Sequence, residues 1–107
     1  MAQLTLNLVQ GAVSFSFSED AAKQLQLEIA ALMQSLKAIA TATTGAGNRP
    51  VKQESMEYRY TGDVFLEIFC NPNIYPSPFA AKILLTLRDD RIRLTSEAEL
   101  TQLIEDL

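Results

Sequence analysis

The 107-residue sequence contains no histidine, no tryptophan and a single cysteine, Cys70. Without histidine the chain lacks the commonest general base and transition-metal ligand, which excludes Ser-His-Asp and Cys-His arrangements. One cysteine alone can form neither a zinc site of the usual Cys/His kind nor an intramolecular disulfide. We expect Cys70 to be a small buried residue near a strand end. The sequence predicts a non-enzymatic protein with no metal and no cofactor.

Long apolar runs and targeting patterns are also missing. No run approaches the roughly 20 residues that a membrane span requires, and the N-terminus lacks the charged-then-apolar pattern of a secretory signal. No phosphate-binding glycine motif occurs, since the glycines at 45–47 follow a helical pattern instead of preceding one. A net charge of −4 disfavours nucleic acid and anionic membranes as partners. We expect a cytoplasmic protein.

The N-terminal segment reads as a β-hairpin. Residues 4–8 and 13–17 alternate between apolar and polar side chains, which is typical of half-buried strands. A two-residue turn at Gln10–Gly11 sets Leu6 opposite Phe15.

A long helix is predicted next. Ser18 is a suitable N-cap. The apolar residues that follow recur every three or four positions and form one stripe: Ala22, Leu25, Ile29, Leu32, Leu36 and Ile39. About 24 residues span about 36 Å, whereas strands of about seven residues span about 23 Å, so the helix should extend beyond its sheet. We expect a homodimer with Leu32, Leu36 and Ile39 at the interface; the alternative is that a curled sheet or the C-terminal helix covers the whole stripe.

The rest of the chain reads as a flexible loop over 44–57 followed by strands and a closing helix. Strands are expected at Tyr58–Tyr60, at Val64–Cys70 and from Ala81 onward, with an Asp89–Asp90 turn that sets Leu87 opposite Ile92. Ser96 and Glu99 have the spacing of a capping box before the last helix. The prediction is a single α+β domain over 1–107, of order ββαβββ(β)α. Its antiparallel sheet of five to six strands carries the long helix and the short C-terminal helix on one face.

Several carboxylates and cations are candidate functional groups, but each also has an ordinary structural role. Asp63, Asp89 and Asp90 lie in turns, where aspartate usually serves turn geometry. Glu67 lies mid-strand, and we expect Arg59 or Tyr58 to pair with it. A basic group forms a candidate site for an anion or RNA, or else a solvated strand face: Lys82, Arg88, Arg91 and Arg93.

The proline-rich loop from Asn71 to Pro78 is the most distinctive stretch. Its prolines limit its freedom, so its side chains could be presented to a partner at small entropic cost. The partner-binding candidates here are Asn71, Asn73, Ile74, Tyr75 and Phe79. The alternative is that Tyr75 and Phe79 fold back against the edge of the core.

The stretch ILLTLRDDRIRLTSEAELTQLIEDL, residues 83–107, resembles the C-terminal part of small cyanobacterial proteins and carries no motif with an assigned role. That resemblance implies a cytosolic protein of a photosynthetic bacterium. The element order is similar to roadblock-type and profilin-like domains, regulatory or scaffolding modules that often dimerise, although the first roadblock helix is missing. We therefore predict a homodimeric protein-interaction or regulatory module; the alternative is an anion- or RNA-binding protein.

Overall fold

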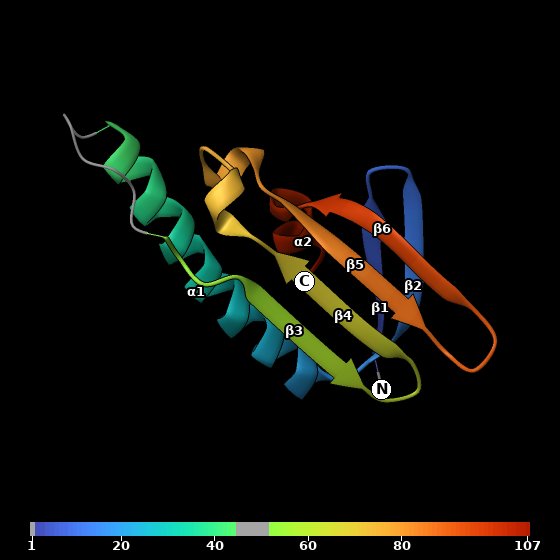
Figure 1. Cartoon of the computed structure of the whole chain (residues 1–107). Coiled ribbons are helices and arrows are strands. Elements are labelled where there is room, and N and C mark those ends of the chain that lie inside the picture. Colours follow the sequence, from blue (N-terminus) through green and yellow to red (C-terminus); the bar gives the residue numbers. More distant parts are fainter. Residues whose placement is uncertain (1, 45–51) are drawn as a thin grey trace.

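The computed structural model describes residues 2–44 and 52–107, and its α+β element order agrees with the prediction (Figure 1). The elements are β1 Ala2–Leu8, β2 Gly11–Phe17, α1 Glu19–Thr44, β3 Met56–Thr61, β4 Phe65–Cys70, the single-turn 3₁₀ helices η1 Pro72–Ile74 and η2 Pro78–Ala80, β5 Lys82–Arg88, β6 Arg93–Glu99 and α2 Leu100–Asp106. Of the predicted loop over 44–57, residues 45–51 lie outside the described residues. No helix in the described part combines the length and apolar character needed to cross a membrane.

The strands form two antiparallel sheets instead of one sheet of five or six strands. Among the described strands, β1 and β2 form a two-stranded sheet, and the other four form a sheet in the order β3-β4-β5-β6. A backbone hydrogen bond of 3.0 Å from the N–H of Val9 to the carbonyl of Glu97 joins the first hairpin to β6. The first hairpin therefore forms a sheet of its own, and the prediction of a single sheet of five to six strands is wrong.

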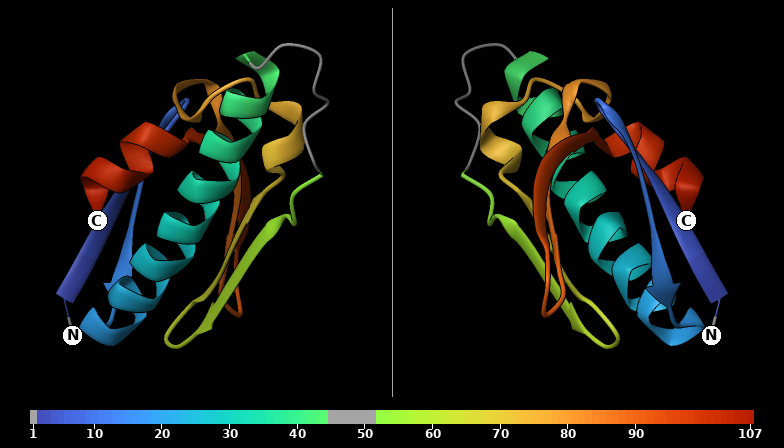
Figure 2. Two further views of the ribbon diagram at one scale, coloured as in Figure 1. Left: turned by 90° about the vertical axis from the view of Figure 1, so that its left-hand side faces the viewer. Right: turned by 90° about the vertical axis from the view of Figure 1, so that its right-hand side faces the viewer.

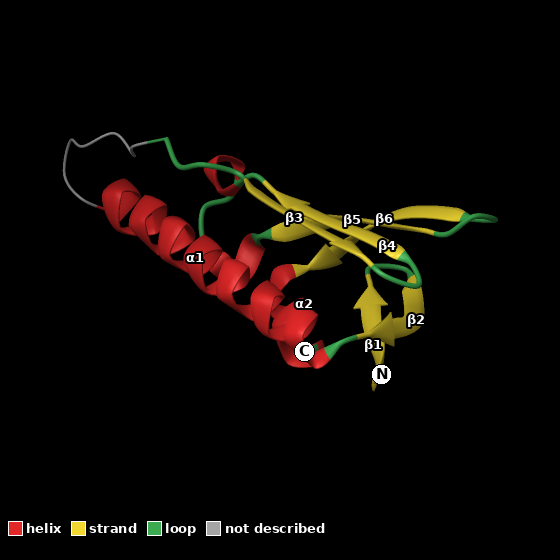
Figure 3. Ribbon diagram, turned by 90° about the horizontal axis from the view of Figure 1, so that it is seen from below, coloured by secondary structure: helices red, strands yellow, loops and turns green. Residues whose placement is uncertain are grey.

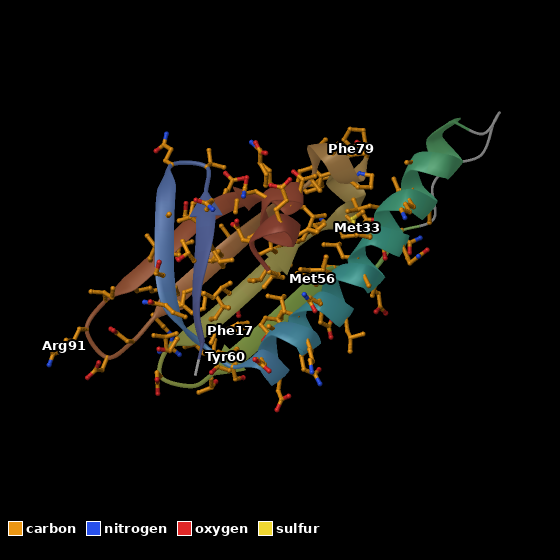
Figure 4. All side chains as sticks on the ribbon, turned by 180° about the vertical axis from the view of Figure 1, so that it is seen from behind. Phe17, Met33, Met56, Tyr60, Phe79 and Arg91 are labelled. Carbon is orange, nitrogen blue, oxygen red and sulfur yellow. The ribbon has the colours of Figure 1, made fainter. Side chains whose placement is uncertain are left out.

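The four-stranded sheet is covered on one face, which we call the inner face. Figure 3 shows α1, α2 and the β1–β2 hairpin on the same side of this sheet, and the side views in Figure 2 agree. The sheet's buried inward residues are Met56, Tyr58, Leu66, Ile68, Cys70, Ile83, Leu85, Leu87 and Ala98. Both helices lie on the predicted single face, and the hairpin completes their layer by placing the Phe17 ring 4.8 Å from that of Tyr60 (Figure 4).

The first hairpin has a different register from the predicted one. Leu6 lies opposite Val13, not Phe15, because the turn residues are Val9 and Gln10. Gly11 begins β2 with φ +107°, a conformation that glycine tolerates better than other residues. The register therefore differs by two residues, which leaves every side chain on its predicted face.

The last hairpin shows the same kind of shift. Leu87 lies opposite Leu94 instead of Ile92. The side chain of Asp89 accepts hydrogen bonds from the N–H groups of Arg91 at 2.8 Å and Ile92 at 2.9 Å, which lengthens the turn. These bonds hold the pKa of Asp89 below its ordinary value.

The predicted capping box at Ser96 and Glu99 is wrong. Ser96 lies within β6 opposite Leu85, and α2 begins only at Leu100. A capping box contributes about 1 kcal/mol, whereas pairing with β5 satisfies the backbone of the whole strand. The N–H of Leu100 then donates to the carbonyl of Ala81 at 3.0 Å.

α1 begins as predicted, since Ser18 Oγ accepts a hydrogen bond from the N–H of Ala21 at 3.1 Å. Its C-terminal turns extend past the strands (Figure 1). Leu32, Leu36 and Ile39 are nevertheless buried within the chain, and η1 and η2 contact α1. The structure contradicts the premise that the overhang leaves these three side chains for a second subunit.

α2 is joined to the first hairpin by Asp106. Its carboxylate accepts hydrogen bonds from the backbone N–H of Asn7 at 2.7 Å, from Asn7 Nδ2 at 3.0 Å and from Gln102 Nε2 at 2.9 Å. Burial works to raise the pKa of Asp106, but these hydrogen bonds outweigh it and hold the pKa below its ordinary value. The C-terminal helix and the N-terminal hairpin thus support each other.

Candidate functional site

Amide side chains hold the loop between β4 and β5 in shape. Asn71 Oδ1 accepts hydrogen bonds from the backbone N–H of Asn73 at 3.0 Å and from Asn73 Nδ2 at 2.9 Å. Asn73 Nδ2 donates to the carbonyl of Gln53, and Asn73 Oδ1 accepts from the N–H of Gln53, both at 2.7 Å. Asn71 and Asn73, two of the predicted partner-binding residues, therefore act within the chain, where they fix the loop against residues 52–55.

Two further side chains of this region face inward. Tyr75 is partly buried and packs against the core, so the alternative that it folds back is correct for this residue. Burial raises the pKa of Tyr75. Cys70 is buried as predicted, and burial raises its pKa to about 11, which keeps the thiol protonated at neutral pH. Neither group is presented to a partner as a reactive side chain.

Ile74 and Phe79 are the loop residues that remain open to solvent. Ile74 is 66% exposed and Phe79 is 85% exposed, the largest value among the large apolar side chains of the described residues. They belong to η1 and η2, each of which begins at a buried proline, Pro72 and Pro78. Since exposure of a whole aromatic ring to water is unfavourable, a Phe held outward on a fixed loop is a candidate binding element.

A groove of about 430 Å³ lies between α1 and α2. It is lined by Ile29, Ala30, Met33, Ile104 and Leu107, with Gln26, Gln34 and Lys37 completing its wall. η2, which carries Phe79, contacts both helices. Figure 4 shows Met33 on α1 and Phe79 on η2. The sequence did not predict this groove, because Met33 lies beside the apolar stripe of the long helix and not in it.

The basic group predicted on the last hairpin divides into two parts. Arg88 and Arg93 lie opposite each other at one end of the sheet, and Arg91 lies in the adjoining turn. The guanidinium of Arg88 lies 4.5 Å from the centre of the Phe65 ring. Lys82 lies at the other end of β5 opposite Glu99, about 20 Å away along the strand. The four cations therefore do not form one patch.

Glu67 pairs with Arg59, one of the two partners expected for it. Arg59 Nε donates to Glu67 Oε2 at 2.9 Å across β3 and β4. This hydrogen bond and the carboxylate charge raise the pKa of Arg59. Within the described residues, no group of three or more His, Cys, Asp or Glu side chains is placed to hold a metal ion.

Comparisons of the chain with protein-family models, with curated proteins and with solved structures found no match. The resemblances to cyanobacterial proteins and to roadblock-type and profilin-like domains stay predictions. The geometry of this chain is therefore the basis for any functional statement.

Proposed function

We propose that this protein is a non-enzymatic interaction module whose protein partner docks on the loop side chains Ile74 and Phe79. The single observation that carries the proposal is the 85% exposure of Phe79 on η2, a turn closed by backbone hydrogen bonds from Ala80 to Ser77 at 3.2 Å and from Ala81 to Pro78 at 3.3 Å. Because the loop is already ordered, binding requires little further loss of conformational entropy. Burying such a ring contributes about 1.5–3 kcal/mol.

The neighbouring groove supports this proposal. Its apolar wall comes from α1 and α2, and η2, which carries Phe79, contacts both of these helices, so one partner can contact the groove and Phe79 together. A partner with an apolar ridge and an acidic group near Lys37 would complement this surface.

The state of the candidate catalytic side chains supports a non-enzymatic role. The sequence has no histidine, and the thiol of Cys70 is buried with a raised pKa. Glu67 is paired with Arg59, and Asp89 is hydrogen-bonded to its own turn. Activation of a thiol nucleophile requires a nearby base or a lowered pKa, whereas burial raises the pKa of Cys70.

The test compares two isoleucines of nearly equal exposure, Ile74 at 66% and Ile92 at 65%, on different loops. Phe79→Ser and Ile74→Ser should each weaken the complex with the partner by about tenfold or more, since each removes apolar burial. Ile92→Ser should leave the affinity unchanged. The partner is first isolated on the immobilised full chain, and dissociation constants are then measured by calorimetry with purified proteins.

Equal binding by Phe79→Ser and by the unsubstituted chain would contradict the proposal. The variants must show unchanged urea unfolding, which is expected because both side chains lie outside the core.

The anion- or RNA-binding alternative rests on Arg88, Arg91 and Arg93 without Lys82. Glutamates on the same sheet face oppose it, because phosphate backbones require a positive surface. It predicts binding of an oligonucleotide whose affinity falls steeply with salt and is lost in Arg88→Ala.

A further inference from the structure

The outer face of the four-stranded sheet, opposite α1, is basic at one end. The strand register sets Phe65 beside Arg88 and Arg88 beside Arg93 in one row across the sheet. Arg91 adds a third arginine in the adjoining turn. The carboxylate of Asp89 is occupied by backbone N–H groups of that turn. These bonds hold the pKa of Asp89 below its ordinary value, so Asp89 keeps its negative charge and, with Asp90, offsets Arg91. The positive charge of this end of the face is that of Arg88 and Arg93.

The other end of the same face is acidic. Glu57 lies beside Phe69 on β3 and β4, and Glu97 lies in the same row on β6. One row further, Glu99 lies opposite Lys82. The basic and acidic ends are about 20 Å apart, since six residues of β6 separate them.

Apolar side chains occupy the middle of this face. Phe65, Phe69 and Leu84 point outward, and Leu84 is 43% exposed. In Figure 3, α1, α2 and the first hairpin all lie on the sheet's other side. β4 is an inner strand of the sheet, and Phe65 and Phe69 on its outer face are only partly buried.

The outer face is neutral although the chain carries a net charge of −4. Its four cations are Arg59, Lys82, Arg88 and Arg93, and its four anions are Glu57, Glu67, Glu97 and Glu99. A neutral face with opposite charge at its two ends is complementary to itself when one copy is reversed along the strands. This charge complementarity indicates that a second copy of the chain binds to the outer face.

We propose that two copies of this protein associate through their outer sheet faces, with a two-fold axis lying in the interface at right angles to the strands. This axis sets the basic end of each copy on the acidic end of the other. A two-fold axis parallel to the strands would instead set the basic end of each copy on the basic end of the other. Because the interface is isologous, each contact occurs twice.

The strand register determines which residues of the two copies meet across the interface. With the axis at the row of Glu67, Arg93 meets Glu97 of the second copy, and Phe65 meets Phe69 of the second copy. The two sheets form a sandwich about 10 Å apart, with their strands about 30° from parallel. The inference does not depend on the partner site at Ile74 and Phe79, which lies on the loop between β4 and β5 and beside the helices.

The association is weak. Four strands about 4.8 Å apart and about 20 Å long bury roughly 1,000 Å² in total, the low end for specific complexes. The Arg59–Glu67 pairs at the axis must also lose water, and each of these side chains meets its own counterpart in the second copy, so both effects oppose association. We expect a dissociation constant of about 100 µM.

The test is sedimentation equilibrium of the full chain from about 1 µM to about 1 mM. The unsubstituted chain should pass from one to two copies over this range. Arg93→Glu and Glu97→Arg should each remain monomeric, because each sets like charges against each other twice. Arg93→Glu should still fold, since it replaces the like-charge pair of Arg88 and Arg93 with an opposite-charge pair.

The decisive sample is an equimolar mixture of Arg93→Glu and Glu97→Arg. In a mixed dimer, the glutamate introduced at position 93 of one copy meets the arginine introduced at position 97 of the other. The native Glu97 of the first variant meets the native Arg93 of the second. The mixture should therefore associate although neither variant does alone. General damage to the fold would not produce this recovery.

Three results would overturn the inference. The first is a chain that stays monomeric at about 1 mM. The second is dimerisation that Arg93→Glu and Glu97→Arg leave unchanged, which would place the interface elsewhere. The third is a monomeric chain that binds an oligonucleotide through Arg88 and Arg93, which would assign this face to nucleic acid. Loss of partner binding in Phe79→Ser changes none of these outcomes, so the two proposals fail separately.

Discussion

On β5, Leu85 points to the inner face of the sheet and is fully buried, whereas its neighbour Leu84 points to the outer face and is 43% exposed. The inner face is filled with side chains from α1, α2 and the first hairpin. The outer face carries a few apolar residues together with charged side chains. Arg88 and Arg93 lie toward one end of the strands and most glutamates toward the other. The inner face therefore stabilises the fold, whereas the outer face is partly open to solvent.

The largest expected difference between the faces is in core packing. Leu85→Ala should lower the free energy of unfolding by about 2–5 kcal/mol, because it removes buried methyl groups and leaves a cavity. Leu84→Ala, its matched control on the same strand, should lower it by less than about 1 kcal/mol. Urea unfolding at about 1 µM protein, where self-association is negligible, measures both. Equal losses would show that the outer face is as tightly packed as the inner one.

The next largest change in the free energy of unfolding is expected at a hydrogen bond on the inner face. Tyr58 donates from its hydroxyl to the carbonyl of Ala21 at 3.2 Å, joining β3 to the start of α1. Tyr58→Phe should lower the free energy of unfolding by about 0.5–1.5 kcal/mol at neutral pH.

The pH dependence of this difference is specific to Tyr58. Burial, followed by the charges of Tyr60 and Glu28, raises its pKa from 10.0 to about 12. Folding therefore favours the protonated hydroxyl, so the stabilisation is present below pH 10 and is lost as pH rises to about 12. The difference from Tyr58→Phe should shrink over this range in urea unfolding experiments. A constant difference would contradict the role assigned to burial.

The outer-face ion pair gives the smallest effect. Arg59 and Glu67 lie 2.9 Å apart, but the Arg59 side chain is 65% exposed, so water and salt screen the pair. A double-mutant cycle with Arg59→Ala and Glu67→Ala should give a coupling energy below the loss in Tyr58→Phe. The coupling should approach zero in about 1 M salt, where the screening length is about 3 Å. A coupling energy unaffected by salt would mean that this ion pair is shielded from water and dissolved ions.

The two hairpins show how far sequence reasoning reaches. In both, alternation named the inward strand residues correctly except for Ile92, which lies in the turn and is 65% exposed, and the predicted register was wrong by two residues. A shift of two keeps every side chain on its face, so apolar patterning cannot detect it. The turns decided instead, through Gly11 in one hairpin and the Asp89 hydrogen bonds in the other.

The candidate site was predicted only in part. The proline-rich loop stays a prediction as a partner site, and the sequence could not separate its inward and outward residues. Asn71, Asn73 and Tyr75 serve the fold, whereas Ile74 and Phe79 are exposed. The loop's packing against α1 decided this, and it also buried Leu36 and Ile39, which were expected at a subunit interface.

The spacing of apolar residues by itself determined which segments are strands or helices and which side of each is buried, because those periods are local properties of the backbone. The strand alternation of the second half also set the outward positions. Only tertiary structure decided that the first hairpin leaves the main sheet and joins the helices, and that strand pairing extends β6 through Ser96. Both outcomes depend on contacts between residues distant in the chain, and a local pattern holds no information about them.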